Sequence, residues 1–294
     1  MVGPWPHGGW ASTDGDKLGD IHFGSKTAAF YRAEIEFPFF EKYLKDHAVA
    51  APAEASVFET GSNSWRTFDA WPPREAQPKQ LFLGEQELLT FEPPAAATGF
   101  DEFVSDPARP VPYTEKITPR MTIEYMVEDQ RFAARRPDVL VYQTPRLDKD
   151  LVVAGPLDVE LWVSTTGTDA DFVVKLIDVF PDSPDAAQQP GYQMMVRSEV
   201  FRGRFRNSFE QPEPFVPGQP TRIRFELQDV LHRFAPGHRL MIHVQSTWFP
   251  LVDRNPQKYV PNIYLAQPGD FQKATHRVYR SAQHPTHLRL RVLP

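Results

Sequence analysis

One histidine near the start of the sequence has the surroundings of a catalytic group. The stretch GPWPHGGW, residues 3–10, places His7 among prolines, glycines and two tryptophans. A rigid loop of this kind would hold an imidazole in one position, as general acid–base catalysis requires. The plainer interpretation is a loop histidine that stacks on Trp5 or Trp10. The local sequence by itself leaves both interpretations open.

The other histidines do not form a metal-binding pattern. His238 and His243 are five residues apart, so on one strand they face opposite sides and cannot share a metal. His276, His284 and His287 lie in a C-terminal stretch rich in turn signals, with no carboxylate at a recognisable spacing. The sequence has no cysteine, which excludes disulfides and thiolate metal sites and leaves the cellular compartment open. We therefore expect no metal and no cofactor.

Four carboxylates flank or interrupt the apolar stretch DFVVKLIDVFPD: Asp169, Asp171, Asp178 and Asp182. A calcium loop needs more oxygen ligands and a sharp glycine turn, so we interpret these residues as caps of strand ends and turns. Asp178 is different, because it shares a strand face with apolar residues and a buried carboxylate needs a partner. An arginine such as Arg239 or Arg254 would serve, and the sequence does not choose between them.

The charge pattern argues against a nucleic-acid partner. The net charge is −6, and the one basic cluster, Arg202, Arg204 and Arg206, alternates with Gly203 and Phe205. We interpret these arginines as the solvated face of one strand.

The stretch STWFPLVDRNPQ combines two aromatic side chains with two adjacent residues of opposite charge. Trp248 and Phe249 could face a substrate or another domain, but packing of one domain against another is the interpretation we favour. Asp253 beside Arg254 would then pin the loop. The role of residues 248–255 stays open.

One amphipathic helix precedes all the strands. Five apolar residues recur at steps of three or four along FGSKTAAFYRAEIEFPFFEKYLKDH: Phe30, Ala33, Phe37, Phe40 and Leu44. Ser25 is the expected N-cap, and Pro38 predicts a kink or a restart of the helix. So aromatic a stripe must either pack on a large apolar surface or remain exposed.

From about residue 50 the hydrophobic period changes from helical to two. Alternation predicts half-buried strands around 157–163, 223–227, 240–244 and 288–292, while 172–179 is apolar on both faces and predicts a central strand. Turn signals separate these runs, and we expect no helix of useful length after residue 50. The fold class is therefore mainly β, an antiparallel sandwich of the jelly-roll kind. No run of 18 apolar residues exists, so we expect no membrane partner.

Long motifs give the chain a resemblance to a known family. The stretches VLVYQTPRLDKDLVVAGPLDVELWVSTTGTDADFVVKLIDVFPD and FELQDVLHRFAPGHRLMIHVQSTWFPLVDRNPQ resemble the C-terminal jelly-roll domain, galactose-binding-like in fold, of X-Pro dipeptidyl-peptidase and cocaine-esterase-like serine hydrolases. EIEFPFFEKYLKD and FETGSNSWRTFDAWPP are similar to the branch of α-amino-acid ester hydrolases and glutaryl-7-aminocephalosporanic acid acylases. The resemblance covers essentially the whole chain.

The resemblance implies a role for His7. In these hydrolases the histidine of the Ser-Asp-His triad lies in a GPWxHG-like loop, and His7 matches that position. The nucleophile and the acid precede the histidine in α/β-hydrolases, yet this chain has no Gly-x-Ser-x-Gly. We therefore expect residues 1–70 to be the C-terminal remnant of an α/β-hydrolase domain, with the triad-histidine loop and the last helix. Residues 71–294 would be the jelly-roll β-sandwich.

Two functions follow from different classes. The first is the C-terminal portion of a serine hydrolase whose substrate is a small ester or amide, such as an α-amino-acid ester or a β-lactam acyl side chain. Such a chain would be inactive alone, because it lacks the serine and the aspartate. The alternative is a non-catalytic β-sandwich for binding or oligomerisation, since fold does not settle function. Members of the family are often oligomers, which leaves a homo-oligomer open.

Overall fold

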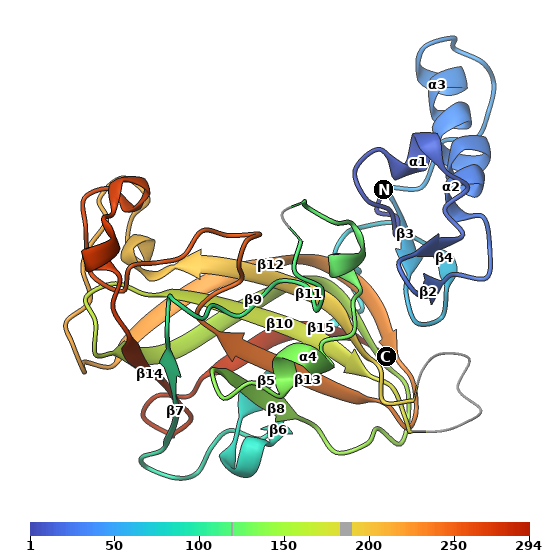
Figure 1. Ribbon diagram of the computed structural model, residues 1–294. Helices are drawn as coiled ribbons and strands as arrows, with labels where there is room; N and C mark the ends of the chain where they lie inside the picture. The colour runs from blue at the N-terminus through green and yellow to red at the C-terminus, as the bar shows by residue number, and fades with distance from the viewer. Residues whose placement is uncertain (119, 183–189) are drawn as a thin grey trace.

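The sequence folds into a β-sandwich with a mixed N-terminal segment at one end (Figure 1). The computed structural model describes residues 1–118, 120–182 and 190–294. The named strands pair antiparallel throughout these residues. The predicted fold class, a mainly β jelly-roll sandwich, is confirmed.

The larger sheet is built around the long strand β9 (Leu151–Thr165). One side of β9 pairs with β12 and the other with β15 and β14 in succession. The remaining strands of this sheet, in chain order, are β5 (Gln77–Leu83), β6 (Leu89–Thr90), β7 (Phe100–Ser105), β12 (Thr221–Phe234), β14 (Ala274–Tyr279) and β15 (His287–Leu293). The second sheet has the order β11 (Gln193–Arg202), β10 (Asp171–Val179), β13 (Arg239–Gln245) and β8 (Val139–Gln143).

Alternation of side chains puts the main core between the two sheets. On β9, Leu157, Leu161 and Val163 are buried in this core, while Asp158 on the other face is exposed. The strands expected at 157–163, 223–227, 240–244 and 288–292 are all present.

Strand β10 is buried on both faces, as its apolar pattern predicts. Phe172, Val174 and Leu176 point into the core between the sheets. Val173 points to the outer face, where it packs with Tyr113 and other apolar side chains. The four-stranded sheet is therefore covered on its outside by chain segments that lie between strands.

Helices beyond residue 50 are single turns in the described residues, which confirms that expectation. They are η2 (Glu85–Glu87), η3 (Glu124–Met126), α4 (Arg131–Ala134), η4 (Gly203–Phe205), η5 (Ile263–Leu265) and η6 (Pro268–Asp270).

The N-terminal segment contains the predicted helix and two small hairpins. The helix runs through α2 (Thr27–Phe30), a π-helical stretch η1 (Tyr31–Glu36) and α3 (Phe37–Tyr43). The hydrogen-bond pattern restarts at Phe37, so that Pro38, which has no N–H to donate, falls in the first turn of α3. The restart expected at Pro38 is confirmed. The expected N-cap is wrong: Lys26 precedes the first turn, and no side chain caps it.

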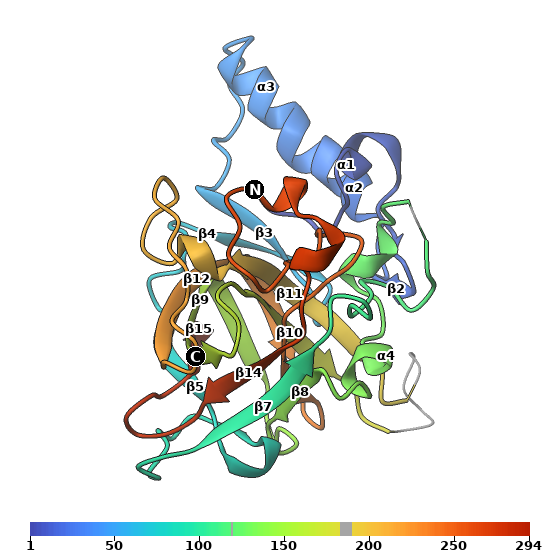
Figure 2. The ribbon, with the colours of Figure 1, turned by 60° about the vertical axis from the view of Figure 1, so that its left-hand side comes forward.

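The aromatic side of this helix is exposed. Figures 1 and 2 both show α3 projecting away from the sandwich. Phe37 is 60% exposed and Phe40 is 47% exposed. The stripe thus remains open to solvent in this chain, one of the two outcomes that the sequence allows.

The remaining N-terminal elements tie the segment to the sandwich. They are α1 (Gly9–Ser12), β1 (Lys17–Leu18), β2 (Ile21–His22), β3 (Ala55–Glu59) and β4 (Ser64–Phe68). Val2 bridges to Val57 on β3, and the turn after β3 reaches β12, where the backbones of Thr60 and His232 form a bridge. Gly61 in that turn has a φ of +90°, and a Cβ there would lie 2.1 Å from the carbonyl oxygen of Arg233. Only glycine permits so close an approach.

Candidate functional site

Trp5 holds the loop around His7 in place. Trp5 Nε1 donates a hydrogen bond to Thr27 Oγ1 over 2.8 Å, and the buried Thr27 hydroxyl donates to the carbonyl of Gly15 over 2.5 Å. The Trp5 ring also packs against Tyr31 and Trp65 at centroid distances of 5.3 and 5.9 Å. The chain on the N-terminal side of His7 is therefore fixed through side chains of α2, η1 and β4.

The ring of His7 itself is exposed. It meets Trp10 at a ring-centroid distance of 5.9 Å, so the plainer interpretation names the right neighbour, but the rings meet edge-on rather than stacked. Gly8, at φ +77°, turns the chain sharply into α1. Within residues 1–118, 120–182 and 190–294, no serine hydroxyl and no carboxylate forms a hydrogen bond with this imidazole. The geometry presents a fixed imidazole to the outside of the chain, and its catalytic role stays a prediction.

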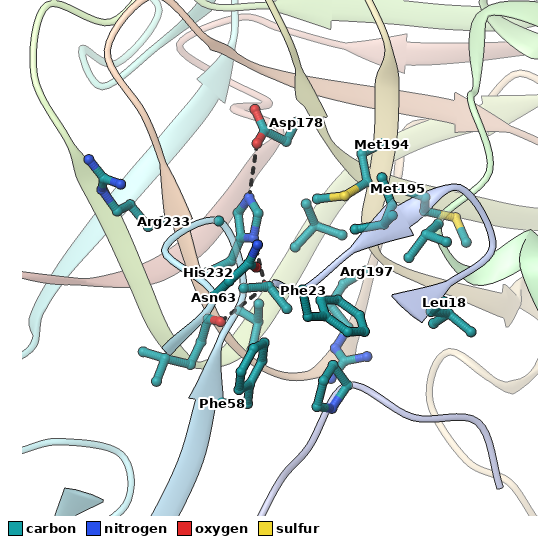
Figure 3. Close-up of a pocket in the computed structure, with 18 of the residues that line it drawn as sticks. Leu18, Phe23, Phe58, Asn63, Asp178, Met194, Met195, Arg197, His232 and Arg233 are labelled. Carbon is teal, nitrogen blue, oxygen red and sulfur yellow. Dashed lines mark hydrogen bonds and ion pairs between the residues drawn. The ribbon is translucent and has the colours of Figure 1, made fainter. Parts of the chain in front are cut away.

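A second cluster of titratable groups surrounds Asp178 (Figure 3). His238 Nδ1 lies 2.8 Å from Asp178 Oδ1, and His232 Nε2 lies 3.2 Å from Asp178 Oδ2. Burial raises the pKa of Asp178, but the hydrogen bonds from the two imidazoles outweigh it, and the net pKa is lowered. The Nδ1 of His232 in turn lies 2.8 Å from the hydroxyl of Thr60.

The partner expected for Asp178 is wrong. Arg239 donates to the carbonyl of Thr144, and Arg254 donates to the carbonyl of Pro107. Two histidines replace the arginine because β12 and the turn before β13 bring them over the end of β10. The sequence does not indicate that His232 contacts Asp178, because the two residues are 54 positions apart.

A buried lysine forms a third group of interest. Lys175 on β10 is fully buried, and its Nζ donates to Gln130 Oε1 over 2.8 Å. Burial lowers its pKa to about 7. His243, on the neighbouring strand β13, lies opposite Lys175 and is also fully buried. Neither of its ring nitrogens has a hydrogen-bond partner in the described part of the chain. His238 and His243 therefore face different surroundings, as their spacing predicts.

The three C-terminal histidines are not in a turn-rich tail. His276 lies on β14 and His287 on β15, both buried, and only His284 lies in the turn between them. Burial lowers the pKa of His276 to about 3. No group of three or more His, Asp or Glu side chains in the described ranges is placed to hold a metal ion. Nor is any helix of those ranges long and apolar enough to cross a membrane.

The basic cluster is not a solvated strand face. Arg204 lies after the end of β11, is buried, and donates to Asp169 Oδ2 from Nε at 2.9 Å. Arg202 pairs with Asp253. Both arginines serve as partners of carboxylates, which the alternation with Gly203 and Phe205 does not reveal.

The loop 248–255 packs on the sandwich itself. Trp248 is buried in the outer cluster with Tyr113, Val173 and Met195. Asp253 and Arg254 hold the loop through partners outside it: Asp253 pairs with Arg202, and Arg254 donates to the carbonyl of Pro107. Asn255 donates to the buried carboxylate of Asp171, whose pKa burial raises to about 7. Packing of this loop against another domain stays a prediction.

Comparisons with known proteins agree on the kind of domain. Residues 47–289 match the family model of the X-Pro dipeptidyl-peptidase C-terminal non-catalytic domain. The whole chain is 28% identical to cocaine esterase from Rhodococcus sp. (strain MB1 Bresler), of which it covers 51%.

Two solved structures are similar over nearly the whole chain. An aminopeptidase from a marine sediment archaeon, Thaumarchaeota archaeon, is 44% identical with a TM-score of 0.95, and the match covers 100% of this chain and 49% of that one. An α-amino acid ester hydrolase is 44% identical with a TM-score of 0.94, and the match covers 99% of this chain and 49% of that one. The chain thus spans about half the length of the relatives that it matches. It is similar to cocaine esterase and to an α-amino acid ester hydrolase, and it belongs to the family of X-Pro dipeptidyl-peptidase C-terminal non-catalytic domains.

Proposed function

We propose that this chain acts as the C-terminal portion of a serine hydrolase, with His7 as the base of a Ser-Asp-His triad. The observation that carries the proposal is the exposed imidazole on a loop that Trp5 and Thr27 hold in place. The base of a triad needs a fixed backbone around it and a ring that stays accessible to the serine. The similarity to longer hydrolases supports the same assignment.

The chemistry would proceed through an acyl-enzyme. Nε2 of His7 would accept the proton of a serine hydroxyl as that oxygen attacks the carbonyl carbon of the substrate. The protonated ring would then give this proton to the leaving group, and a carboxylate at Nδ1 would fix the tautomer. In this proposal the serine and the carboxylate come from polypeptide outside these 294 residues, so the chain alone does not turn over substrate.

The proposed substrates are esters or amides of small acyl groups. The names of two similar structures, an aminopeptidase and an α-amino acid ester hydrolase, support substrates with an α-amino group. α-Amino-acid esters and β-lactam acyl side chains are the specific members of this class that we propose.

A non-catalytic role is the second candidate. The matching family model describes a non-catalytic domain, and it covers residues 47–289 but not His7. The exposed aromatic side of the helix gives such a module a surface for contact with another protein.

A chimera separates the two candidates. The half of the α-amino acid ester hydrolase that this chain does not match would be fused in front of residue 1, and hydrolysis of p-nitrophenyl acetate would be followed. We expect turnover by the chimera and none above background by the 294-residue chain alone. A folded chimera without turnover, or turnover by the chain alone, would contradict the proposal.

A further inference from the structure

A cavity of about 420 Å³ lies between the N-terminal segment and the end of the sandwich (Figure 3). This volume falls in the range of pockets that hold small organic molecules. Its wall combines three parts of the chain: residues 2–5 beside the His7 loop, the hairpins β1–β2 and β3–β4, and the ends of β10, β11 and β12. Trp5, which holds the His7 loop, also lines this cavity, whereas His7 itself does not.

Most of the cavity wall is apolar. The side chains that form it include Leu18, Ile21, Phe23, Phe58 and Met194, and all five are buried. Figure 3 shows Phe23 and Phe58 on one side and Met194 on another. Such a wall fits the aromatic or aliphatic body of a ligand, because burial of that body removes apolar area from water.

One cation on this wall has no anionic partner. Arg197 on β11 donates from Nε to the carbonyl of Asp229 over 2.8 Å. Its two terminal nitrogens have no acceptor among the described residues, and the Asp229 carboxylate instead accepts from Trp71 Nε1 over 2.6 Å. Burial lowers the pKa of this guanidinium, and Asp229 offsets only part of the effect. An arginine nevertheless stays protonated in a protein, so the wall presents a positive charge that has no ion-pair partner and that Asp229 compensates only in part.

The other charges along the cavity are already satisfied. Both oxygens of Asp178 lie within hydrogen-bond distance of imidazoles. Arg233 pairs with Asp150 at 2.8 Å. Arg197 is thus the charged group of this wall that is left for a ligand, and the edge formed by its two terminal nitrogens suits a carboxylate.

We propose that the cavity binds a small carboxylate with an apolar body, and that the guanidinium of Arg197 anchors its carboxylate group. The apolar body lies against Phe23 and Phe58. The inference does not depend on the proposed hydrolase function, since it uses neither His7 nor a serine.

Titration of the 294-residue chain with phenylacetate tests this site. Calorimetry should give saturable one-to-one binding in the range of about 1 mM or tighter, as expected for a ligand of this size. Phenylacetamide has the same shape without the charge and should bind at least about tenfold more weakly, because a charge-assisted hydrogen bond is lost. Equal affinity for the two compounds, or no saturable binding of phenylacetate, would overturn the proposal.

Two variants locate the anchor. R197Q should weaken phenylacetate binding by about tenfold or more. R224Q replaces an exposed arginine on β12 that pairs with Glu160, and it should change the affinity for phenylacetate by less than about twofold. Unchanged affinity in a folded R197Q would refute the assignment. If R197Q does not fold, the comparison of phenylacetate with phenylacetamide on the unmodified chain still decides.

Discussion

Replacement of Lys175 by methionine should stabilise the protein at neutral and mildly acidic pH. The ammonium group is fully buried on β10, and Gln130 accepts its one hydrogen bond. It also lies 5.1 Å from the ring centroid of Trp248. No carboxylate in the described residues forms an ion pair with it. Methionine keeps the length of the apolar stem and removes the charge.

The size of the effect follows from the pKa of the lysine. Burial lowers it from 10.5 to about 7, and each tenfold change in proton affinity corresponds to about 1.4 kcal/mol. Burial of the charged form therefore costs about 5 kcal/mol as an upper limit below pH 7. The variant leaves Gln130 Oε1 without a donor, which costs about 1–3 kcal/mol, and it loses the contact of the cation with Trp248, worth about 2 kcal/mol. A net gain of up to about 2 kcal/mol remains at pH 6.

The sign of the pH dependence is the sharper part of the prediction. Between about pH 7 and pH 10.5 the folded lysine is neutral while the unfolded lysine still binds a proton, so the stability of the natural sequence rises with pH across this window. The advantage of K175M should shrink across the same window, and urea unfolding at pH 6, 8 and 10 measures it. K79M, at an exposed position on β5, is the matched control and should show no such trend. A K175M protein that is less stable at pH 6, or whose difference does not change with pH, would refute the reasoning.

Three other predictions concern the network, the turn and the helix. D178N should cost about 1–3 kcal/mol at pH 7, because an amide replaces a carboxylate held by two imidazoles. Because the fold lowers the pKa of Asp178 below the usual 3.8, the free energies of unfolding of the two proteins should converge as the pH falls below about 3.8; a gap that stays constant on acidification would argue against it. G61A should lower the melting temperature by an amount equivalent to about 1–3 kcal/mol, because its Cβ would collide with the carbonyl of Arg233. G269A is the control, since a Cβ there meets nothing within 4 Å, and equal melting temperatures of the two variants would contradict the need for glycine at position 61. The chain should self-associate or bind a hydrophobic dye, and the double variant F37E/F40E should do so less; a monodisperse parent that binds no dye contradicts this.

The sheets could be predicted because their signal is local. Residues 157–163 alternate strictly, and this alternation by itself places Leu157 and Leu161 in the core. The central strand β10 was visible because both of its faces are apolar. Two charged residues inside that strand, Lys175 and Asp178, indicate buried charged groups. The sequence predicts a partner for Asp178 and none for Lys175.

The partners of buried charges could not be predicted, because they depend on contacts far apart in the sequence. Asp178 meets His232 and His238 only in the folded protein, where β12 of the other sheet packs over β10 and β13 pairs beside β10. Arg204 appears solvated in the sequence but lies against Asp169, 35 residues earlier. That the guanidinium of Arg197 has no ion-pair partner is likewise a property of the fold, since its surroundings come from segments that are far apart in the chain.

The part played by His7 is tested most directly by one ratio of rates. In the chimera described above, kcat for p-nitrophenyl acetate should fall at least about 10³-fold in His7→Ala, because a triad base cannot be removed without loss of the attacking oxygen's reactivity. His22→Ala, another exposed histidine of the same segment, should change kcat by less than about twofold, since it touches no reacting group. A His7→Ala chimera that keeps the rate of the His22→Ala protein would show that this imidazole is not the base.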